Sequence, residues 1–528
     1  HVRTELPTWR AHNEQAMALA AAAYAKATQR RRVLACTTSV GPGATNMVTA
    51  AALAHVNRLP LLLLPGDTFA SRRPDPVLQQ VESFGDPNVT VNDCFRPVSR
   101  FWDRISRPEQ LLASLPQALS VLLDAADCGP VTLALPQDVQ TEAGEFPESF
   151  FAPRLHVPAR IGPDAGQLQL AAGLLAAARR PLIIAGGGVL YSAAGAALAR
   201  FAASRGLPVA ETQAGKGTLP WDHPCNVGAV GVTGTSVANA LAADADLVLA
   251  IGTRLADFTT GSGRLFRNPD CRFVAVNVCR HDLVKRNALG LQADARRAIE
   301  ALELELRDVP VDLSWLHFAQ ARAAAWNDER ATVRGTGGKP SDADVLLAVN
   351  RCSGADTTVV CAAGGLPGEL HKLWRVGQPG SYHVEYGFSC MGYEIAGGLG
   401  VKLAQPDQTV IVLVGDGSYL MMNSEIATSI ALRAKLVIVV LDNRGFGCIN
   451  RLQASCGGDS YNNLLEAAAP DIDFVGHARA LGAAAERAAD LEALESCLQR
   501  AFAADRTSVI VIETDPAASS AVGGAWWD

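Results

Sequence analysis

The sequence lacks any closely spaced cysteine pair, although its 528 residues include twelve cysteines. The absence of C-x-x-C excludes the common zinc-knuckle spacings and predicts reduced thiols, as in the cytoplasm. The ten histidines form no H-E-x-x-H pair, so no zinc site on one helical face is expected. No apolar run approaches the roughly 18 residues that cross a bilayer, and residues 1–15 lack the apolar core of a signal peptide. We therefore expect a cytoplasmic protein without a membrane partner.

The chain also lacks a block of basic residues. Lys and Arg number 46 against 53 Asp and Glu, which gives a formal net charge of −7. Nucleic acid is therefore not an expected partner. Aromatic residues make up 6% and charged residues 19%, whereas hydrophobic residues reach 49%, enough to bury a large core. At about 150 residues a domain, the length predicts three or four domains.

Short β-branched or leucine-rich runs alternate with alanine-rich helical stretches along the chain. This pattern predicts the α/β fold class, in which helices cover both faces of parallel sheets. We expect three parallel-sheet domains, at residues 1–150, 160–310 and 335–528, with linkers at 141–164 and 302–334. The expected strands of the first domain are Arg32–Cys36, Leu59–Leu64 and Val131–Leu135, and its expected helices are Glu14–Gln29 and Gly43–His55. The six-stranded, Rossmann-like middle domain is expected to include strands at Pro181–Ala185, Leu207–Glu211, Leu247–Gly252 and Arg272–Val278.

The third domain contains the densest motif of the chain, TVIVLVGDGSYLMMNSEIATSIALRAKLVIVVLDNR, at residues 409–444. Two apolar strands, Thr409–Val414 and Lys435–Leu441, flank a helical segment, Met421–Ala434, which predicts one βαβ unit. Each strand ends in a polar turn. Adjacent parallel strands place such turns side by side at the carboxyl edge, where α/β sheets bind ligands.

The two turns have the composition of a metal–diphosphate site. In the first turn, Gly415–Ser418, the glycines allow a tight bend with backbone N–H groups at a helix N-terminus, which suits a phosphate. Asp416 and Asn443 supply hard oxygen ligands, and the carbonyl of Gly445 can give a third, as Mg²⁺ prefers. Either turn alone is more often explained by backbone conformation.

Together, the two turns resemble the signature of the thiamin-diphosphate-dependent enzymes, in which a GDG is followed some two dozen residues later by an Asn. Asp416 and Asn443 are 443 − 416 = 27 positions apart. The resemblance implies thiamin diphosphate and Mg²⁺ as cofactors. The cofactor contacts implied here are Gly415, Asp416, Gly417, Ser418 and Asn443, and the implied metal ligands are Asp416, Asn443 and Gly445.

A second motif opens the first alanine-rich helix, where His12-Asn13-Glu14-Gln15 resembles the glutamate motif of this family. The family's glutamate touches N1′ of the aminopyrimidine and promotes the tautomer that removes the thiazolium C2 proton. Glu14 is therefore the implied catalytic and cofactor-binding residue, although the helix dipole alone would explain a lone glutamate there. The segment Thr38–Asn46 is similar to the SGPGATN loop of acetolactate-synthase-like enzymes, which implies that Pro42 and Asn46 lie near the pyrimidine.

A third motif, Tyr386–Gly392, is similar to the family segment that supports the bent cofactor. Met391 matches the apolar wedge, and the backbone at Ser389 and Met391 would pair with the pyrimidine. Without the resemblance, Met391 would be interpreted as a core residue. Upstream, Gly365 and Leu366 stand where the family has another diphosphate loop.

The resemblance covers essentially the whole chain, in the order pyrimidine-binding, middle and diphosphate-binding domain. Glu14 and Asp416 must meet around one cofactor, which in the family happens across a subunit interface, so a homodimer or homotetramer is expected. Relatives carry a strand and helix before the glutamate, so the first domain is expected to be N-terminally incomplete. In the middle domain, Gly186–Gly188 lacks the G-x-G-x-x-G spacing of dinucleotide-binding proteins and is interpreted as packing.

Several stretches resemble one branch of the family, which opens a cyclic 1,2-diketone by adding water across a C–C bond. This implies a small cyclic polyol-dione as substrate, with 3D-(3,5/4)-trihydroxycyclohexane-1,2-dione opened to 5-deoxy-D-glucuronate in myo-inositol catabolism. Acetolactate synthase or 2-oxoacid decarboxylase activity is the alternative, and a non-catalytic protein that kept the fold is another. The stretches are Val91–Ser99, Glu211–Lys216, Leu219–His223, Gly368–Trp374, Glu385–Glu394 and Gly445–Leu452.

Water addition requires a general acid or base near the substrate carbonyls. The sequence leaves these groups open, because a histidine satisfied within the structure is at least as good an interpretation of each candidate. A surface ion pair is likewise the better interpretation of an arginine that could reach the substrate. The candidates are His12, His371 and His383, together with Glu385, Tyr386 and Arg96.

Overall fold

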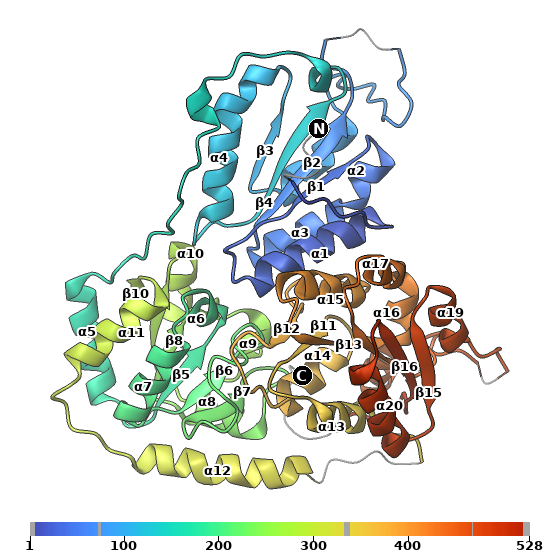
Figure 1. Ribbon diagram of the computed structural model, residues 1–528. Helices are drawn as coiled ribbons and strands as arrows, with labels where there is room; N and C mark the ends of the chain where they lie inside the picture. The colour runs from blue at the N-terminus through green and yellow to red at the C-terminus, as the bar shows by residue number, and fades with distance from the viewer. Residues whose placement is uncertain (1–5, 72–74, 332–337, 467, 521–528) are drawn as a thin grey trace.

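The computed structural model describes residues 6–71, 75–331, 338–466 and 468–520, which form three β-sheets covered by helices (Figure 1). All strand pairs within the three sheets are parallel. The central strands are buried runs of Val, Ile and Leu, because helices shield both faces of a parallel sheet. The α/β class expected from the sequence is confirmed.

The first sheet has four strands in the order β1-β2-β4-β3. Its first helix, α1 (Glu14–Ala27), begins where the side chain of Asn13 accepts a hydrogen bond from the N–H of Ala16. Alanines dominate the buried side of α1, which lets a neighbouring helix approach closely. The other elements are β1 (Ala35–Thr38), α2 (Pro42–Asn46), α3 (Val48–Asn57), β2 (Leu61–Asp67), η1 (Val91–Val98), β3 (Phe101–Arg104), η2 (Pro108–Gln110), α4 (Leu111–Leu123) and β4 (Pro130–Pro136).

The middle sheet has six strands in the order β10-β9-β8-β5-β6-β7, with the first strand at the centre. This is the strand order of a Rossmann fold, as expected from the sequence. Its elements are α5 (Ala165–Ala177), β5 (Pro181–Ala185), α6 (Gly187–Tyr191), α7 (Gly195–Arg205), β6 (Val209–Glu211), β7 (Asn226–Ala229), α8 (Ser236–Asp244), β8 (Leu247–Ile251), α9 (Asp257–Thr260), β9 (Arg272–Asn277), α10 (Arg280–Leu283), η5 (Lys285–Asn287), β10 (Leu289–Gln292) and α11 (Ala295–Glu305).

The third sheet has six strands in the order β12-β11-β13-β14-β16-β15. Strands β13 and β14 lie side by side, with Gly415 opposite Leu441, so their following turns are neighbours. The elements are α13 (Asp342–Cys352), β11 (Thr357–Cys361), α14 (Leu366–Leu373), β12 (Tyr382–Val384), α15 (Tyr393–Ala404), β13 (Thr409–Gly415), α16 (Asp416–Met421), α17 (Glu425–Ala431), β14 (Val437–Asp442), α18 (Gly447–Ser455), α19 (Phe474–Ala480), β15 (Ala484–Ala488), α20 (Leu491–Ala503) and β16 (Ser508–Glu513).

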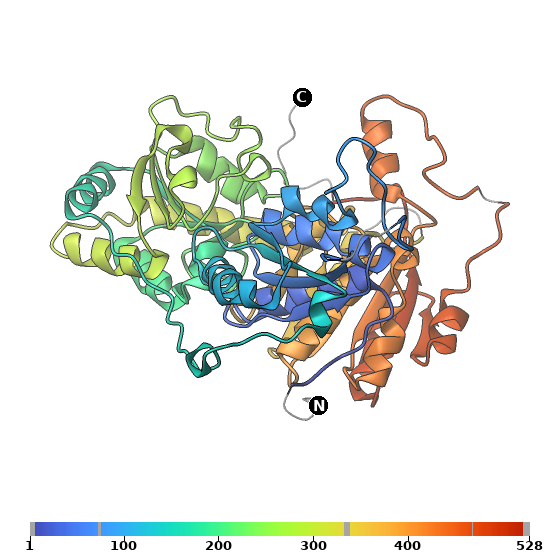
Figure 2. The same ribbon diagram turned by 90° about the horizontal axis from the view of Figure 1, so that it is seen from above.

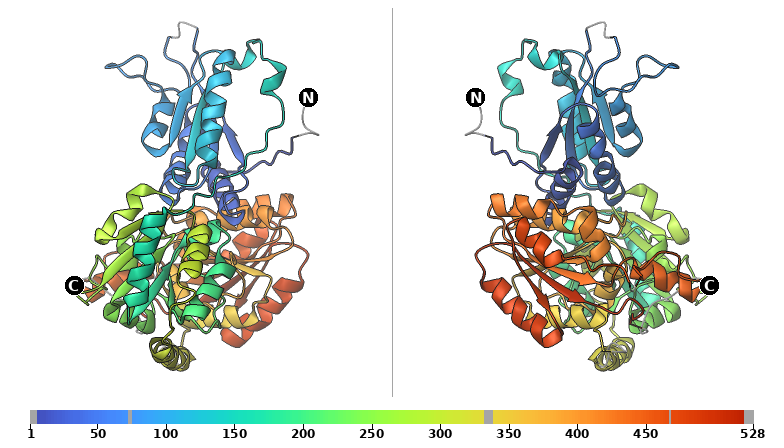
Figure 3. Two further views of the ribbon diagram at one scale, coloured as in Figure 1. Left: turned by 90° about the vertical axis from the view of Figure 1, so that its left-hand side faces the viewer. Right: turned by 90° about the vertical axis from the view of Figure 1, so that its right-hand side faces the viewer.

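The first sheet and its helices stand above the other two units, with the middle unit at lower left and the third at lower right in Figure 1. Seen from above, the first unit covers the junction between the other two (Figure 2). Both side views agree, and they show α12 (Ser314–Ala331) along the bottom of the molecule (Figure 3). Helix α12 thus links the middle and third units on the side opposite the first unit.

Helix α1 joins the first unit to the third by packing against α15. A Cβ atom at Gly400 would overlap the carbonyl oxygen of Ala20, so only glycine allows this close approach. At the far end of α1, the ammonium of Lys26 donates a hydrogen bond of 2.6 Å to the carbonyl of Val384. The packing of α1 against α15 is therefore a main part of the interface between the first and third units.

Two helices expected from the sequence are each divided in the structure. The expected helix Met421–Ala434 is wrong: α16 starts at Asp416, Met422 leaves helical geometry at φ −155° and ψ 88°, and α17 starts at Glu425. The expected helix Gly43–His55 is divided into α2 and α3. Boundaries also shift at β1, which begins three residues after the expected Arg32.

The two predicted linkers differ in structure. Residues 141–164 contain η4 (Glu148–Phe150) and little other regular structure, and η3 (Val139–Thr141) ends where they begin. The second linker, residues 302–334, contains α12, and its last three residues lie outside the described part of the chain. Among the helices of the described residues, none is both long enough and apolar enough to cross a membrane.

Candidate active site

The structure brings the two polar turns of the third unit together at the carboxyl edge of its sheet. Asp416, the first residue of α16, is only 4% exposed, and Asn443 follows β14 directly. The backbone N–H groups of Gly417, Gly445 and Asn443 lie around the Asp416 carboxylate and act to lower its pKa. Burial, followed by the nearby charge of Asp442, nevertheless raises the pKa of Asp416 to about 7.

Two side-chain oxygens at this edge have no partner among the described residues. Oδ1 of Asp416 and Oδ1 of Asn443 are both buried and accept no hydrogen bond. Buried oxygens of this kind are almost always satisfied in proteins, and a divalent cation would satisfy both. The carboxylate–amide pair thus has the oxygen chemistry that Mg²⁺ prefers. Among the described residues, no group of three or more His, Cys, Asp or Glu side chains could hold a metal ion. A metal at this edge would therefore need amide or backbone oxygens as further ligands.

Several glycines in and after these turns lie so close to neighbouring atoms that a side chain would not fit, and one borders open space. Gly445 has a φ of +142°, and a Cβ there would overlap the carbonyl oxygen of Asn463. A Cβ on Gly447 would lie 3.0 Å from Nδ2 of Asn443. Around Gly415, by contrast, a Cβ would meet open space, and Gly417 faces the ring of Phe446.

A buried carboxyl group that sequence reasoning missed links three of the predicted cofactor loops. Glu394, 1% exposed, accepts a hydrogen bond of 2.7 Å from Oγ of Ser418 and one of 3.3 Å from the N–H of Ala363. Ser418 in turn accepts a hydrogen bond of 2.7 Å from the N–H of Gly392. Burial raises the pKa of Glu394 to about 7. A charged residue in an apolar helix, YEIAGGLG, was the signal that could have identified it.

A second carboxylate holds the loop that carries Ser389 and Met391. Glu385 accepts hydrogen bonds of 2.8 and 2.9 Å from the N–H groups of Phe388 and Cys390, and one of 2.9 Å from the amide of Asn57 in the first unit. Within this loop Ser389 is exposed, with a φ of +54°, and Met391 packs partly against the core. Glu385 therefore fixes the loop instead of projecting toward a substrate.

The remaining predicted diphosphate residues lie at the start of α14. Gly365 is the N-cap of this helix, and Leu366 is its first residue and is buried. A Cβ on Gly365 would come within 2.7 Å of the guanidinium of Arg451 and 3.7 Å of Cys448, so α18 lies against this loop. The loop thus borders the same edge as Asn443 and Gly445.

The predicted pyrimidine-binding residues form a separate cluster in the first unit. Nδ2 of Asn46 donates a hydrogen bond of 2.9 Å to the carboxylate of Glu14, and Asn46 and Pro42 are both exposed. Gly43 leaves room for the other Glu14 oxygen, which would lie 3.4 Å from a Cβ there. Among the described residues, no hydrogen bond joins Glu14 or Asn46 to the turns at Asp416 and Asn443. The two clusters therefore lie in different units of the chain, without a hydrogen bond between them.

The start of α1 is anchored on the third unit close to Glu14. The N–H groups of His12 and Asn13 each donate a hydrogen bond of 3.1 Å to the same carboxylate oxygen of Glu425. The ring of His12 lies 2.8 Å from the hydroxyl of Thr428. His12 is nevertheless exposed, so its ring is open to solvent beside Glu14.

The other histidine candidates are structural. His371 is 1% exposed, and its ring nitrogens lie 2.9 Å from the Thr233 hydroxyl and 3.1 Å from the Glu211 carbonyl. Burial lowers the pKa of His371 to about 3. His383 is also buried, and its Nε2 lies 2.6 Å from the hydroxyl of Tyr393. Both rings are buried, and both nitrogens of His371 are engaged, so the structure favours a structural role for these two histidines.

The two remaining candidates also have structural partners. Arg96 forms an ion pair of 2.6 Å with Asp93 and lies 3.6 Å over the ring of Trp102. Tyr386 is hydrogen-bonded to Arg254 at the edge of a large cavity in another part of the molecule. Neither side chain contacts the turns at Asp416 and Asn443.

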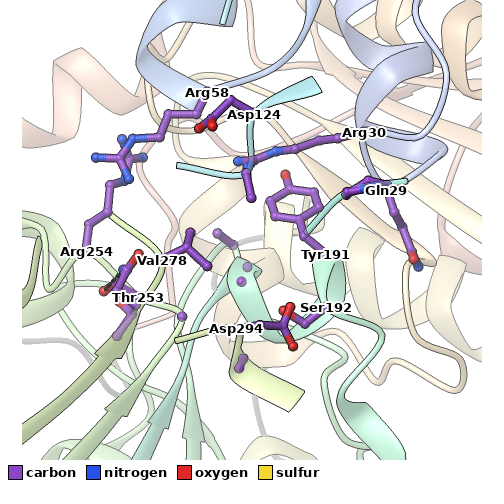
Figure 4. Close-up of a pocket in the computed structure, with 18 of the residues that line it drawn as sticks. Gln29, Arg30, Arg58, Asp124, Tyr191, Ser192, Thr253, Arg254, Val278 and Asp294 are labelled. Carbon is purple, nitrogen blue, oxygen red and sulfur yellow. Dashed lines mark hydrogen bonds between the residues drawn. The ribbon is translucent and has the colours of Figure 1, made fainter. Parts of the chain in front are cut away.

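That cavity, of about 510 Å³, lies at the carboxyl ends of the middle strands and reaches the first unit (Figure 4). Arg30 from the first unit stacks over Tyr191 at 3.8 Å, while Arg58 and Arg254 lie on the opposite side. The Gly186–Gly188 turn packs here as the sequence suggested, because a Cβ on Gly188 would lie 2.6 Å from the Cα of Gly252. None of the predicted cofactor residues is among the described residues that line this cavity.

Comparison with known proteins agrees with this three-part organisation. The family model described as the thiamine pyrophosphate enzyme N-terminal TPP binding domain matches residues 2–85, the central domain matches 168–302, and the C-terminal TPP binding domain matches 362–512.

Curated relatives extend the similarity over nearly the full chain. A 3D-(3,5/4)-trihydroxycyclohexane-1,2-dione hydrolase of Clostridium perfringens is 42% identical over 557 residues, covering 99% of this chain and 87% of the relative. Proteins of the same name from Bacillus cereus and Geobacillus thermodenitrificans are 41% and 42% identical, with the same coverage. The chain therefore belongs to the thiamine pyrophosphate enzyme family.

Proposed function

We propose that this protein hydrolyses a C–C bond of 3D-(3,5/4)-trihydroxycyclohexane-1,2-dione and so opens the ring to 5-deoxy-D-glucuronate in myo-inositol catabolism. The observation that carries the proposal is the 41–42% identity over 99% of the chain to relatives named as hydrolases of this dione. The reaction adds one water: the bond between two ring carbons breaks, one carbon gains a proton and the other becomes a carboxylate.

We infer that Asp416, Asn443 and the carbonyl of Gly445 would hold Mg²⁺, which neutralises the diphosphate of the cofactor. The two unpartnered oxygens at Asp416 and Asn443 support this role. Bound thiamin diphosphate supplies a nucleophilic carbon and an electron sink, the chemistry that lets a C–C bond beside a ketone break. The residues proposed to contact the diphosphate are Gly365, Leu366, Gly415, Asp416, Gly417, Ser418 and Asn443.

At the other end of the cofactor, Glu14 would bind the aminopyrimidine ring and hold a proton at its N1′ nitrogen. The hydrogen bond from Asn46 supports this role, because it orients the Glu14 carboxylate next to Pro42. Ser389 and Met391 would contact the same ring from the third unit. His12, exposed beside Glu14, is the one candidate acid or base from the sequence that keeps an accessible ring.

The minimal active unit in this proposal is a homodimer, and a homotetramer would contain two such units. The Glu14–Asn46 pair of the first unit has no hydrogen bond to the Asp416–Asn443 edge among the described residues, which supports a site completed by a second chain. We also place the protein in the cytoplasm, because all twelve cysteines are unpaired.

Turnover of the dione tests the proposal, with thiamin diphosphate and Mg²⁺ added together, singly or not at all. Loss of the dione only with both cofactors, without release of carbon dioxide, is the expected result. Glu14→Gln should abolish most of this turnover, whereas Glu142→Gln, on an exposed segment, should not. Cofactor binding without dione turnover, together with carbon dioxide release from 2-oxoacids, would instead assign the protein to a 2-oxoacid decarboxylase or acetolactate synthase.

A further inference from the structure

A small cavity of about 60 Å³ lies where the middle unit meets the third unit. The connection between β6 and β7 forms one wall, the last turn of α12 a second, and the segment after α14 a third. Strand β7 contacts both α12 and α14 in this region. The cavity is large enough for several waters or one small ion.

The first wall contributes a buried lysine that has no hydrogen-bond partner among the described residues. Lys216 is 6% exposed, and its ammonium lies 5.7 Å over the ring of Tyr382. Burial, partly opposed by Glu211 and reinforced by Arg330, lowers the pKa of Lys216 to about 8. An ammonium at a buried position without a hydrogen bond to the described residues is costly, and the nearby charge of Glu211 offsets only part of that cost. The site therefore suits a ligand that accepts hydrogen bonds.

The other two walls each contribute an arginine. Arg330 is 9% exposed, and its Nε donates a hydrogen bond of 2.8 Å to the carbonyl of Leu373. Arg375 stacks at 4.0 Å over Trp221, and its Nε is buried without a partner in the described part of the chain.

A fourth cation, Lys372, also lines the cavity, but its ammonium lies 3.5 Å from the Glu369 carboxylate and donates a hydrogen bond to Ser520. Lys216, Arg330 and Arg375 are therefore the cations left facing the cavity, where their charges repel one another.

One carboxylate, Glu211, is the single acidic side chain among the described residues that line the cavity. Its single negative charge is smaller than the summed positive charge of the cations around the cavity. Its carboxylate also already accepts hydrogen bonds from its own segment. One of its oxygens accepts hydrogen bonds of 3.0 to 3.1 Å from the N–H groups of Gly217 and Leu219 and the hydroxyl of Thr218. Burial also raises the pKa of Glu211. The cavity keeps an excess of positive charge.

We propose that this cavity binds a small oxyanion, such as inorganic phosphate, between Lys216, Arg330 and Arg375. An oxyanion would accept hydrogen bonds from the Lys216 ammonium and from Nε of Arg375, two donors without an acceptor among the described residues. Guanidinium groups bind oxyanions well because their N–H donors match the oxygen geometry. The bound ion clamps the middle unit to the third, because each wall belongs to a different segment.

The position of the cavity also connects it to the predicted cofactor loop. Helix α14 starts at Leu366, next to the diphosphate loop, and Leu373 at its other end lines the cavity. The middle unit already holds this helix, since Gln213 donates a hydrogen bond of 2.8 Å to the carbonyl of Pro367. An oxyanion at the cavity strengthens the same junction.

Calorimetric titration of the full chain with inorganic phosphate tests this site, at constant ionic strength and with thiamin diphosphate and Mg²⁺ present. We expect saturable binding of one phosphate per chain, weakened at least tenfold in Lys216→Met and in Arg330→Met. Arg322→Met, which removes a cation from an exposed position on the same helix α12, should leave the affinity unchanged.

Absence of saturable binding in the wild-type chain overturns the proposal. So does phosphate binding that keeps its affinity in Lys216→Met, because the ion then sits elsewhere, for instance at the arginines of the large cavity. If Lys216→Met fails to fold, Arg375→Gln gives the same test from the more exposed wall. None of these titrations measures dione turnover, so their failure leaves the proposed function untouched.

Discussion

At the level of single residues, the candidate metal site consists of a few buried polar side-chain atoms, chiefly those of Asp416 and Asn443. Three backbone N–H groups lie around the Asp416 carboxylate, yet one of its oxygens and one of Asn443 stay unpartnered among the described residues. The backbone around Asp416 thus leaves one carboxylate oxygen without a hydrogen bond. That leaves two oxygens directed at a common ligand, which we have proposed to be Mg²⁺.

Substitution of Asp416 tests this metal role. Asp416→Asn keeps the size of the side chain but removes the charged ligand, so we expect binding of thiamin diphosphate in the presence of Mg²⁺ to weaken about tenfold or more, roughly 1.4 kcal/mol. Titration calorimetry with and without Mg²⁺ measures the effect. Asp407→Asn, in an exposed turn of the same unit, is the matched control. Equal affinity in Asp416→Asn and wild type would contradict the assignment.

His371 makes a second prediction at this scale, on the pH dependence of stability. Burial lowers its folded-state pKa to about 3, below the unfolded value near 6.5. Its neutral form is favoured in the folded state, so its contribution to stability is complete above pH 6.5 and is lost as pH falls toward 3. Each pH unit in that window costs about 1.4 kcal/mol for one such group.

We therefore expect His371→Gln to unfold with a shallower pH dependence than the wild type. Between pH 6.5 and pH 5, the free energy of unfolding should fall by about 2 kcal/mol less in the variant. Urea denaturation at both pH values measures this difference. His156→Gln, at an exposed position, should retain the wild-type slope. An unchanged slope in His371→Gln would mean that the ring is protonated in the folded state.

Residues in local motifs were predictable from the sequence, and residues that act across the fold were not. Asp416 and Asn443 follow two strands of one βαβ unit, so their proximity could be expected before the structure. Glu394 and Glu425 could not be assigned in this way. Glu425 accepts hydrogen bonds from residues 412 and 413 positions away in the sequence, and only the packing of the first unit on the third creates that contact.

At the scale of elements, the crossing of α1 and α15 decides how the first unit sits on the third. Gly400 and Ala20 meet there without any side chain between the two backbones. Gly400→Ala must push the helices apart, and we expect it to lower the free energy of unfolding by about 1–3 kcal/mol. Chemical denaturation measures the change.

The same substitution in an open helix gives the matched control. Gly173 lies on the exposed face of α5, where an added Cβ would meet nothing within 4 Å. Gly173→Ala should therefore raise the free energy of unfolding by about 0.5–1 kcal/mol. If both variants were stabilised, the close approach of α1 and α15 would not hold in solution.

Strands that coincide with a hydrophobic run of the sequence were predicted well. A helix that is broken by hydrogen bonds of its side chains was not. The strands β13 and β14 coincide with apolar runs of the sequence. The break between α16 and α17 was missed because MMNSE has no proline or glycine to announce it. The break has a local and a tertiary contribution. Nδ2 of Asn423 donates a hydrogen bond of 3.1 Å to the carbonyl of Tyr419, and Glu425 accepts a hydrogen bond from the backbone of His12 at the start of α1.

At the scale of the whole molecule, the Glu14–Asn46 pair and the Asp416–Asn443 edge lie in different units of one chain, and we have proposed that two chains share each cofactor. The α/β class and the six-stranded middle sheet followed from the sequence, because alternating strands and helices leave few other arrangements. The meeting of Glu14 with Asp416 could be expected only from the family resemblance, since no local pattern encodes a subunit interface. The proposed function therefore requires a site that is shared between two chains.

Mixed dimers test that claim most directly. At a thiamin diphosphate concentration well below the weakened affinity of Asp416→Asn, the Glu14→Gln and Asp416→Asn chains are each expected to be nearly inactive alone. After the two are unfolded together and refolded, half of the dimers should pair one chain of each kind. Each such dimer has one site with Glu14 and Asp416 both intact, so dione turnover should recover to about one quarter of the wild-type value. Mixtures that stay inactive while dimers form would contradict a site shared between chains.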